Sequence, residues 1–344
     1  MNDDTSPGNA FDFDKTFLTL TGNSPFPWQQ ALYKRFSDRE IPASCSLPTG
    51  LGKTSVVAIW LIALANFPSH VPRRLVYVVN RRTVVDQTTN EVERYRTALQ
   101  SASLSAVREQ LTKLCTVPIG ARDNVPASPL ALSTLRGQFA DNREWSADPA
   151  RPAVIVGTVD MIGSRLLFSG YGIGFKGKPL HAGFLGQDVL LVHDEAHLEP
   201  AFQTLLTSIE QEQKRCNELG AFRVMELSAT SRVADVNEVA KPFELTALEV
   251  QVPEVVPDPP MQPVHHVWRR LKARKGIRFH PATRNEVAKQ IGELARLRKE
   301  SGKAILIFVR TVKEVEAVRE VLSNKKDGVS TDRVQVLTGT LRGL

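Results

Sequence analysis

The chain has 344 residues, 42% of them hydrophobic and 24% charged, which is an ordinary soluble composition with room for two domains that each have a core. Lys and Arg outnumber Asp and Glu by 44 to 37, and the net charge of +7 suits a polyanionic partner without identifying one. The longest apolar run, residues 56–65, is shorter than the roughly 20 residues that cross a bilayer, so no membrane-spanning segment is expected.

Residues 1–23 are rich in Asp, Asn, Thr, Ser and Gly and predict a flexible lead-in. The start of the chain lacks the basic segment and the apolar run of a signal peptide, so no export is expected. The three cysteines, Cys45, Cys115 and Cys216, form no Cys-x-x-Cys pair and indicate reduced thiols. We therefore expect a cytoplasmic protein.

A helix is predicted to begin at Phe26-Pro-Trp-Gln29. An aromatic ring can stack on adenine while a glutamine amide reads the edge of the base with one donor and one acceptor. Phe26, Trp28 and Gln29 are therefore candidates for an adenine shelf. The alternative, equally open from the sequence, is a proline-capped helix start whose aromatic side chains belong to the core.

The stretch Pro48-Thr-Gly-Leu-Gly-Lys-Thr-Ser55 lies between a strand expected over residues 41–47 and an apolar helix expected over residues 55–67. In a strand, glycine turn and helix of this kind, successive backbone N–H groups point into one concavity at a helix N-terminus, where phosphate binds. Gly50 and Gly52 permit the positive φ angles that such a turn needs.

Two side chains complete this candidate nucleotide site. Lys53 supplies a mobile charge for the β- and γ-phosphates, and Thr54 offers a hydroxyl to Mg²⁺. Leu47 stands where the strict P-loop pattern has glycine, so a tight turn with a surface lysine is the alternative. The candidate nucleotide-binding residues are Phe26, Trp28, Gln29, Thr49, Gly50, Leu51, Gly52, Lys53, Thr54 and Ser55.

Strands and helices then alternate, which predicts an α/β fold with a mostly parallel, doubly wound sheet covered on both faces. The expected strands are 74–79, 129–134, 153–156, 188–193 and 223–227, and the expected helices are 83–98, 104–116, 158–168 and 199–216. Ligands of open α/β sheets bind at the carboxyl ends of the strands, so motifs at those ends carry most weight.

Proline-rich residues 232–263 predict a stiff linker between a first lobe over residues 24–231 and a second lobe over residues 264–344. The second lobe is expected to be a truncated domain of the same kind. Its expected elements are strands over 275–280, 304–309 and 333–337 and helices over 282–300 and 312–323.

An apolar strand is expected to deliver Asp194 and Glu195 at its carboxyl end. Opposite a phosphate loop, Asp194 can hold Mg²⁺ and Glu195 can polarise an attacking water, as ATP hydrolysis requires. The pair His193-Asp194 also matches the core of metal-dependent phosphohydrolases. Strand alternation disfavours that reading, because neighbouring side chains point to opposite faces.

Small or cationic residues follow several other strands. Ser228 and Thr230 can link the carboxylates to a moving neighbour by short hydrogen bonds, although such a tripeptide is more often a turn. Three stretches after strand ends offer donors to a nucleic acid backbone, and their recurrence along one sheet edge predicts sequence-independent binding. The candidate nucleic-acid contacts are Arg81, Arg82, Thr83, Arg136, Gly137 and Thr158.

Together these motifs resemble those of superfamily 2 helicases of the DEAH type, and specifically the CRISPR-associated helicase of type I interference systems. The similar stretches, in chain order, are Phe26-Pro-Trp-Gln29, Thr49-Gly-Leu-Gly-Lys-Thr54, residues 78–87, Ser133-Thr-Leu-Arg-Gly137, residues 156–160, 164–168 and 179–183, Asp194-Glu-Ala-His197, Ser228-Ala-Thr230, residues 307–311 and Leu337-Thr-Gly339. The stretches 133–137 and 156–168 single out the CRISPR-associated branch.

This resemblance implies RecA-like lobes and a motor that uses ATP and Mg²⁺ to move along single-stranded DNA opened by a guide-RNA surveillance complex of the Cascade type. It implies that Gln29 binds adenine, and that Lys53 and Glu195 act in hydrolysis. It also implies that His197, with Ser228 and Thr230, couples hydrolysis to DNA.

Two parts of the family pattern are missing from these 344 residues. There is no Gln-x-x-Gly-Arg-x-x-Arg motif, whose arginine finger contributes roughly 10³–10⁵ in rate, so slow ATP turnover is expected. The His-Asp nuclease domain is also missing and is expected beyond residue 344 or on another chain. The alternatives are a non-catalytic ATP-binding recruitment module and a translocase of a restriction or repair system.

Overall fold

The computed structural model describes residues 11–120, 127–135, 144–218, 220–229, 241–323, 329–330, 333–336 and 338. The chain divides into two compact units, residues 1–273 and 274–344. The first unit holds every motif of the predicted nucleotide site.

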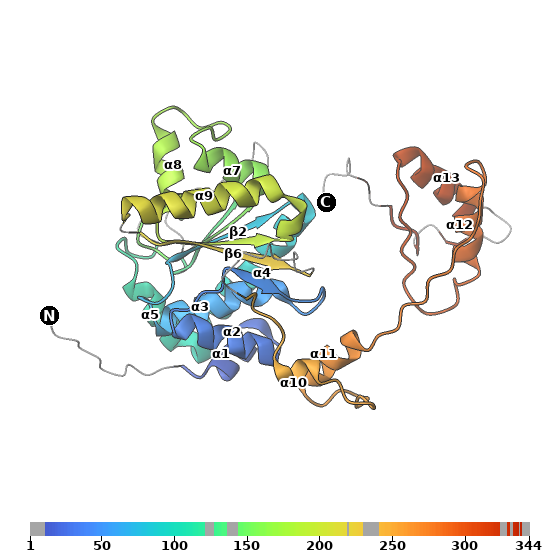
Figure 1. Ribbon diagram of the computed structural model, residues 1–344, viewed down its shortest axis with the longest axis horizontal. Coiled ribbons are helices and arrows are strands. Elements are labelled where there is room, and N and C mark those ends of the chain that lie inside the picture. The colour runs from blue at the N-terminus through green and yellow to red at the C-terminus, as the bar shows by residue number, and fades with distance from the viewer. Residues whose placement is uncertain are drawn as a thin grey trace. The chain divides into compact units, whose positions relative to one another are not determined.

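A six-stranded sheet forms the centre of the first unit, and all of its described pairings are parallel (Figure 1). Its strands are β1 (Ser44–Ser46), β2 (Arg74–Val79), β3 (Ala131–Leu135), β4 (Ala153–Thr158), β5 (Val189–Asp194) and β6 (Phe222–Ser228), in the order β1-β6-β5-β2-β4-β3. The predicted α/β class with a parallel sheet is therefore confirmed.

Two hydrophobic clusters cover the two faces of this sheet. The first joins side chains of α1 (Phe13–Thr21), α2 (Pro27–Ser37), α3 (Val56–Asn66), α4 (Arg82–Ala98) and α5 (Ser105–Lys113). The second joins α6 (Glu144–Ala147), α7 (Val159–Leu166), α8 (Gly177–Gly186) and α9 (Pro200–Cys216). Along β2, Leu75 and Tyr77 belong to the first cluster and Val76 and Val78 to the second, because strand side chains alternate between faces.

The expected flexible lead-in is wrong for residues 13–21, which form α1. Phe13, Phe17 and Leu20 recur at helical spacing and are buried, and the Asp12 side chain caps the helix by accepting from the Lys15 backbone N–H at 2.7 Å. The polar composition concealed this apolar face. Residues 1–10 lie outside the described residues.

The expected linker also differs from the structure, because its described part packs against the first unit. Phe243 pairs with β1, its N–H donating to the Ser44 carbonyl at 2.8 Å. Glu249 is buried on α10 (Ala247–Val250) and accepts from the Trp28 N–H at the start of α2 at 3.2 Å. The unit boundary falls after Ala273 rather than at residue 264, so α11 (Pro263–Leu271) belongs to the first unit. Residues 232–240 lie outside the described residues.

The second unit holds two helices in its described part, α12 (Val287–Arg296) and α13 (Val312–Leu322). None of the three strands expected here is formed by the residues that the structure describes. In the stretch 304–309, Ile307 and Val309 pack against the helices, whereas Leu306 and Phe308 are 73% and 85% exposed. The strand-like alternation is therefore present, but a strand also requires a hydrogen-bonded neighbour.

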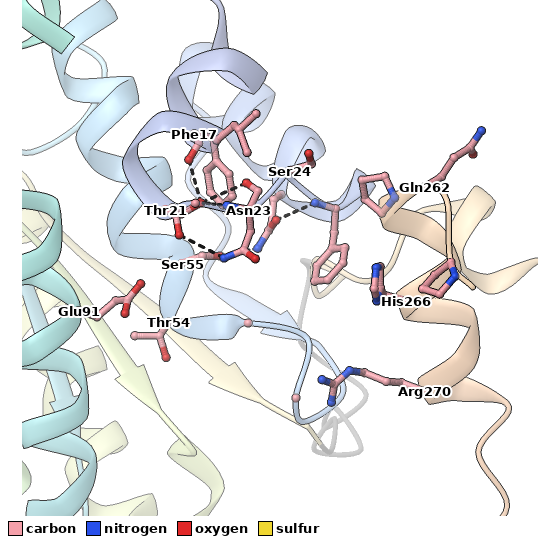
Figure 2. Close-up of a pocket in the computed structure, with 18 of the residues that line it drawn as sticks. Phe17, Thr21, Asn23, Ser24, Thr54, Ser55, Glu91, Gln262, His266 and Arg270 are labelled. Carbon is pink, nitrogen blue, oxygen red and sulfur yellow. Dashed lines mark hydrogen bonds between the residues drawn. The ribbon is translucent and has the colours of Figure 1, made fainter. Parts of the chain in front are cut away.

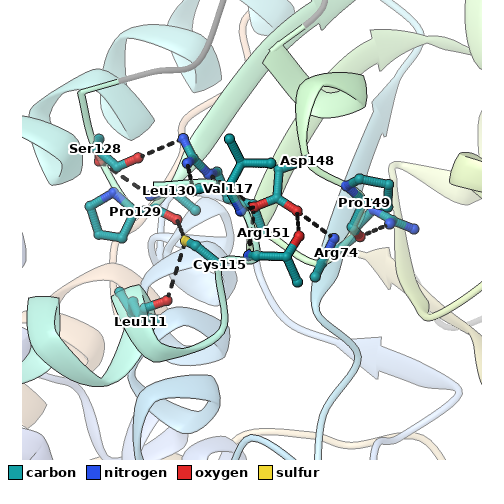
Figure 3. A network of polar contacts seen from close by, with 12 residues as sticks. Arg74, Leu111, Cys115, Val117, Ser128, Pro129, Leu130, Asp148, Pro149 and Arg151 are labelled. Atoms are coloured by element: carbon teal, nitrogen blue, oxygen red, sulfur yellow. Dashed lines mark hydrogen bonds and ion pairs between the residues drawn. The ribbon is translucent and has the colours of Figure 1, made fainter. Parts of the chain in front are cut away.

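At the amino end of β4, a buried network joins Asp148 to the segment that follows α5 (Figure 3). The Asp148 carboxylate accepts from the Thr116 and Val117 backbone N–H groups at 2.9 and 3.0 Å, and Arg151 lies beside it at 3.9 Å. Burial acts to raise the pKa of Asp148, but hydrogen bonds from Thr116, Val117 and Ala150 outweigh it, and the pKa lies below its ordinary value.

We expect Asp148→Asn to lower the free energy of unfolding by about 3 kcal/mol at pH 7, because the buried N–H groups of Thr116 and Val117 lose their charged acceptor. A carboxylate with a depressed folded-state pKa stabilises the fold above its unfolded pKa of about 3.9, and this contribution is lost as the pH falls through the folded value. The difference between the two proteins should therefore shrink in acid. Urea unfolding at pH 7 and at pH 3 measures it.

The matched control is Glu109→Gln, which removes one member of an exposed ion pair with Lys113. Exposed pairs contribute little, so this variant should unfold like the wild type. Equal stabilities of the two variants at neutral pH would contradict the role given to Asp148.

Candidate nucleotide site

The loop between β1 and α3 has the backbone geometry expected of a phosphate site. Gly50 and Gly52 have φ angles of 80° and 73°, which residues with a Cβ rarely adopt. The short 3₁₀ turn η1 (Lys53–Ser55) then leads into α3. The Ser55 N–H already donates to the Gly52 carbonyl at 2.9 Å. The first N–H groups of a helix lack intrahelical partners as a rule, which makes a loop of this shape able to bind an anion.

The structure brings Lys53 and the acidic strand end together. The Lys53 Nζ lies 2.8 Å from Glu195 Oε1, and the lysine side chain is only 9% exposed. Glu195 Oε2 lies 3.5 Å from His197 Nδ1, which is 3.2 Å from the Ser228 hydroxyl. These four side chains therefore form one polar chain across the ends of β1, β5 and β6.

Asp194 lies next to this chain and is held by a residue that sequence reasoning missed. The Tyr77 hydroxyl, fully buried on β2, donates to Asp194 Oδ2 at 2.9 Å. Burial and the Asp194 charge raise the pKa of Tyr77 well above its ordinary value, and a hydrogen bond with Thr54 acts to lower it. Tyr77 thus connects the two predicted Mg²⁺ ligands, although as a tyrosine inside an apolar strand it carries no motif that would reveal it.

The chemistry of these groups fits Mg²⁺. Asp194 Oδ1 is buried and has no hydrogen-bond partner among the described residues, and burial raises the pKa of this carboxyl while Tyr77 and Lys53 lower it. Mg²⁺ prefers oxygen ligands and is commonly held by one or two carboxylates together with substrate phosphates. Asp194 and the Thr54 hydroxyl would hold it here, where it would neutralise phosphate charge.

A cavity of about 650 Å³ opens beside the loop (Figure 2), within the usual size range of small-molecule sites. Phe26, Gln29, Thr54 and Ser55 line it. The Gln29 amide oxygen accepts from the Phe26 N–H at 2.7 Å and its nitrogen donates to Ser55 Oγ at 2.6 Å. Gln29 is thus part of the cavity wall and is already engaged at both ends of its amide.

Two of the predicted nucleotide contacts, Trp28 and Leu51, have fully buried side chains. Trp28 is fully buried in the first hydrophobic cluster, because it shares one helical face with Leu32 and Phe36. Only Phe26 of the predicted aromatic pair lines the cavity. The Leu51 side chain is also fully buried, so only its backbone is available to a phosphate.

Those predicted nucleic-acid contacts that the structure describes lie on the other half of the same sheet edge. Val79 and Thr158 are register partners in β2 and β4, and Arg81 precedes α4 while Thr158 precedes α7. Arg81 and Thr83 are exposed. The Arg82 side chain and residues Arg136, Gly137 and Thr230 lie outside what the structure describes.

His193 points away from Asp194, as strand alternation predicts. Its Nδ1 lies 2.9 Å from Gln203 Oε1, and its ring packs edge-on against Phe202 at 5.1 Å. Among the described residues, no group of three or more His, Cys, Asp or Glu side chains is placed to hold a metal ion. The structure therefore gives no support to a His-Asp metal centre.

The chain therefore has an α/β fold in which a glycine loop at a helix start faces an acidic strand end at the carboxyl edge of a parallel sheet. A family model described as "Type III restriction enzyme, res subunit" matches residues 24–233, and the chain belongs to this family. The match covers the whole sheet and the phosphate loop. No curated protein matches the sequence.

Several solved structures resemble the chain at low identity. The Hef helicase domain of Pyrococcus furiosus is 21% identical, with 87% of this chain and 52% of that chain covered and a TM-score of 0.39. The Type ISP restriction-modification enzyme LlaGI, solved with a DNA substrate mimic, is 14% identical over 81% of this chain and 23% of its own, with a TM-score of 0.38. The chain thus spans about half the length of the Hef structure.

A further comparison is the UvsW helicase of bacteriophage T4, which is 15% identical over 62% of this chain and 56% of its own, with a TM-score of 0.33. In the described part of the chain, no helix has the length and apolar character needed to cross a membrane.

We expect Tyr77→Phe to weaken Mg²⁺-dependent ATP binding roughly fivefold, because Asp194 and Thr54 lose the hydroxyl that orients them. Titrating Mg²⁺ into the protein with a fluorescent ATP analogue measures this. Tyr33→Phe is the control, since its hydroxyl contacts Asn66 away from the cavity. Equal Mg²⁺ dependence of the two variants would show that Tyr77 has only a packing role.

Proposed function

We propose that this chain is the ATP-binding motor of a nucleic-acid translocase. The observation that carries the proposal is the 2.8 Å contact between Lys53 and Glu195, which joins the phosphate loop to the acidic strand end in one partly buried site. A surface lysine beside a simple tight turn would have no reason to be buried against a carboxylate from 142 residues away.

The proposed roles follow from charge and reach. Without nucleotide, the Lys53 ammonium is neutralised by Glu195. When ATP binds, its phosphates compete with Glu195 for the ammonium. Glu195 is then released to accept a proton from the attacking water. His197 contacts both Glu195 and Ser228. We therefore propose that His197 couples hydrolysis of the γ-phosphate to a movement of Ser228 at the end of β6.

The proposed substrate and partners of the motor follow from the resemblance of the motifs to the CRISPR-associated helicase. We propose that the motor moves on single-stranded DNA, that a guide-RNA surveillance complex recruits it, and that a His-Asp nuclease domain acts with it. The family description favours a second candidate, the motor of a restriction system.

We expect Lys53→Ala to weaken ATP binding by about 10- to 100-fold, since charge-assisted contacts to phosphate are worth roughly 1.5–3 kcal/mol. Glu195→Gln should retain ATP binding and lose DNA-stimulated hydrolysis, because the amide cannot accept a proton from the attacking water. Fluorescent-nucleotide binding and phosphate release with single-stranded DNA measure the two effects.

Two exposed residues provide controls, Lys113 and Glu212, which pair locally with Glu109 and Arg215. Lys113→Ala and Glu212→Gln should behave like the wild type. Unchanged nucleotide binding in Lys53→Ala would overturn the proposed function.

We expect Arg81→Ala to weaken binding of single-stranded DNA and to reduce the slope of log K against log salt by about 0.7, the loss of one phosphate contact. Arg94→Ala is matched to it, because Arg94 lies on α4, the helix that Arg81 precedes, is 77% exposed and pairs with Glu91. Fluorescence anisotropy at several salt concentrations measures the slope, and equal slopes for the two variants would remove Arg81 from the interface.

A pull-down with a guide-RNA complex distinguishes the CRISPR motor from the restriction motor. A CRISPR motor should be retained by a guide-RNA complex bound to its target DNA, whereas a restriction motor should ignore it. Loss of retention when the target DNA is omitted is the control for specific recruitment.

A further inference from the structure

Apart from its first residue, the helix α11 lies in the segment that was expected to belong to the second lobe, yet it is fixed to the first unit. Val264 and Val267 are buried, and Trp268 Nε1 donates to the Leu248 carbonyl at 3.1 Å. Lys272, just beyond the helix, donates to the Pro253 carbonyl at 2.9 Å. Contacts at both ends therefore set which side chains α11 presents to the cavity.

Arg270, in the last turn of α11, lies against the phosphate loop (Figure 2). A Cβ added at Gly50 would collide with its guanidinium group. Arg270 lines the same cavity as Gly52 and Thr54, and it is the one Lys or Arg among the described residues that line it. The neighbouring Lys53 directs its charge to Glu195 instead.

No described carboxylate forms an ion pair with Arg270, although its neighbours are paired. Arg269, the preceding residue, lies 3.4 Å from Asp258, and Glu91 in the same cavity lies 3.1 Å from Arg94. Arginine near a helix C-terminus is favoured by the helix dipole, but Arg269 shares that position. The dipole therefore does not explain why one of the two arginines reaches the loop.

We propose that Arg270 is a phosphate-binding residue of the nucleotide site, contacting the phosphate chain of ATP or ADP from the side opposite α3. The inference rests on the proposed function. A guanidinium group forms two parallel hydrogen bonds to phosphate oxygens and keeps its charge at all relevant pH values. The chain thereby gains a second cation at the phosphates in addition to Lys53.

The test compares Arg270→Ala with Arg269→Ala, which removes the same charge from the same helix turn. We expect Arg270→Ala to weaken binding of a fluorescent ADP and ATP about tenfold, and Arg269→Ala to leave it unchanged. Arg270→Lys should restore part of the affinity. Thermal unfolding of each variant checks that α11 remains folded.

Competition by AMP and adenosine identifies the part of the nucleotide that Arg270 contacts. Affinity for adenosine should be the same in wild type and Arg270→Ala, because adenosine has no phosphate. An equal loss for adenosine and ADP would overturn the proposal in favour of stacking on the base. Equal ADP affinities of Arg270→Ala and Arg269→Ala would overturn it outright.

The outcome for Lys53→Ala separates this inference from the function on which it depends. If Lys53→Ala loses nucleotide binding and Arg270→Ala does not, only the role of Arg270 fails. If neither wild type nor variants bind nucleotide, the proposed function itself fails.

Discussion

The ion pair between Lys53 and Glu195 is the contact on which the site depends. The Lys53 ammonium is only 9% exposed, and without a carboxylate beside it this charge would carry a desolvation penalty of several kcal/mol, so its contact with the partly exposed Glu195 links the two segments. β6 lies between β1 and β5, which separates the two segments by two strand spacings of about 4.8 Å each. Long side chains at both ends are needed to cross that gap.

The contacts that stabilise the sheet lie away from this polar contact. Ten consecutive residues of α3, from Val56 to Ala65, are buried between the sheet and the neighbouring helices. The Asp148 network closes the amino edge, away from the carboxyl edge where the phosphate loop, Asp194 and Thr158 lie. Stability and ligand contacts thus occupy opposite edges of one sheet.

The segment after the sheet changes how the site is completed. Residues 241–271 pair with β1, cap α2 through Glu249 and bring α11 to the cavity. The wall of the nucleotide site is therefore built from the beginning and the end of the first unit. The ends are joined because the buried Glu249 carboxylate satisfies the N–H of Trp28, which has no partner within its own helix.

The sequence by itself determined the features that follow from local chemistry: the glycine loop with positive φ, the apolar α3, the alternation of five strands with helices, and the delivery of Asp194 at a strand end. Only the tertiary structure decided which side chains are buried and which residues far apart in the sequence are in contact. Trp28 is buried in the core because of its position on the helix, and residues 13–21 pack their apolar face against the first hydrophobic cluster. Tyr77 bonds to Asp194, and Arg270 lies against Gly50, in each case far away in the sequence. The expected strands of the second unit remained unpaired in its described part, because a strand is completed by a neighbour that its own residues do not specify.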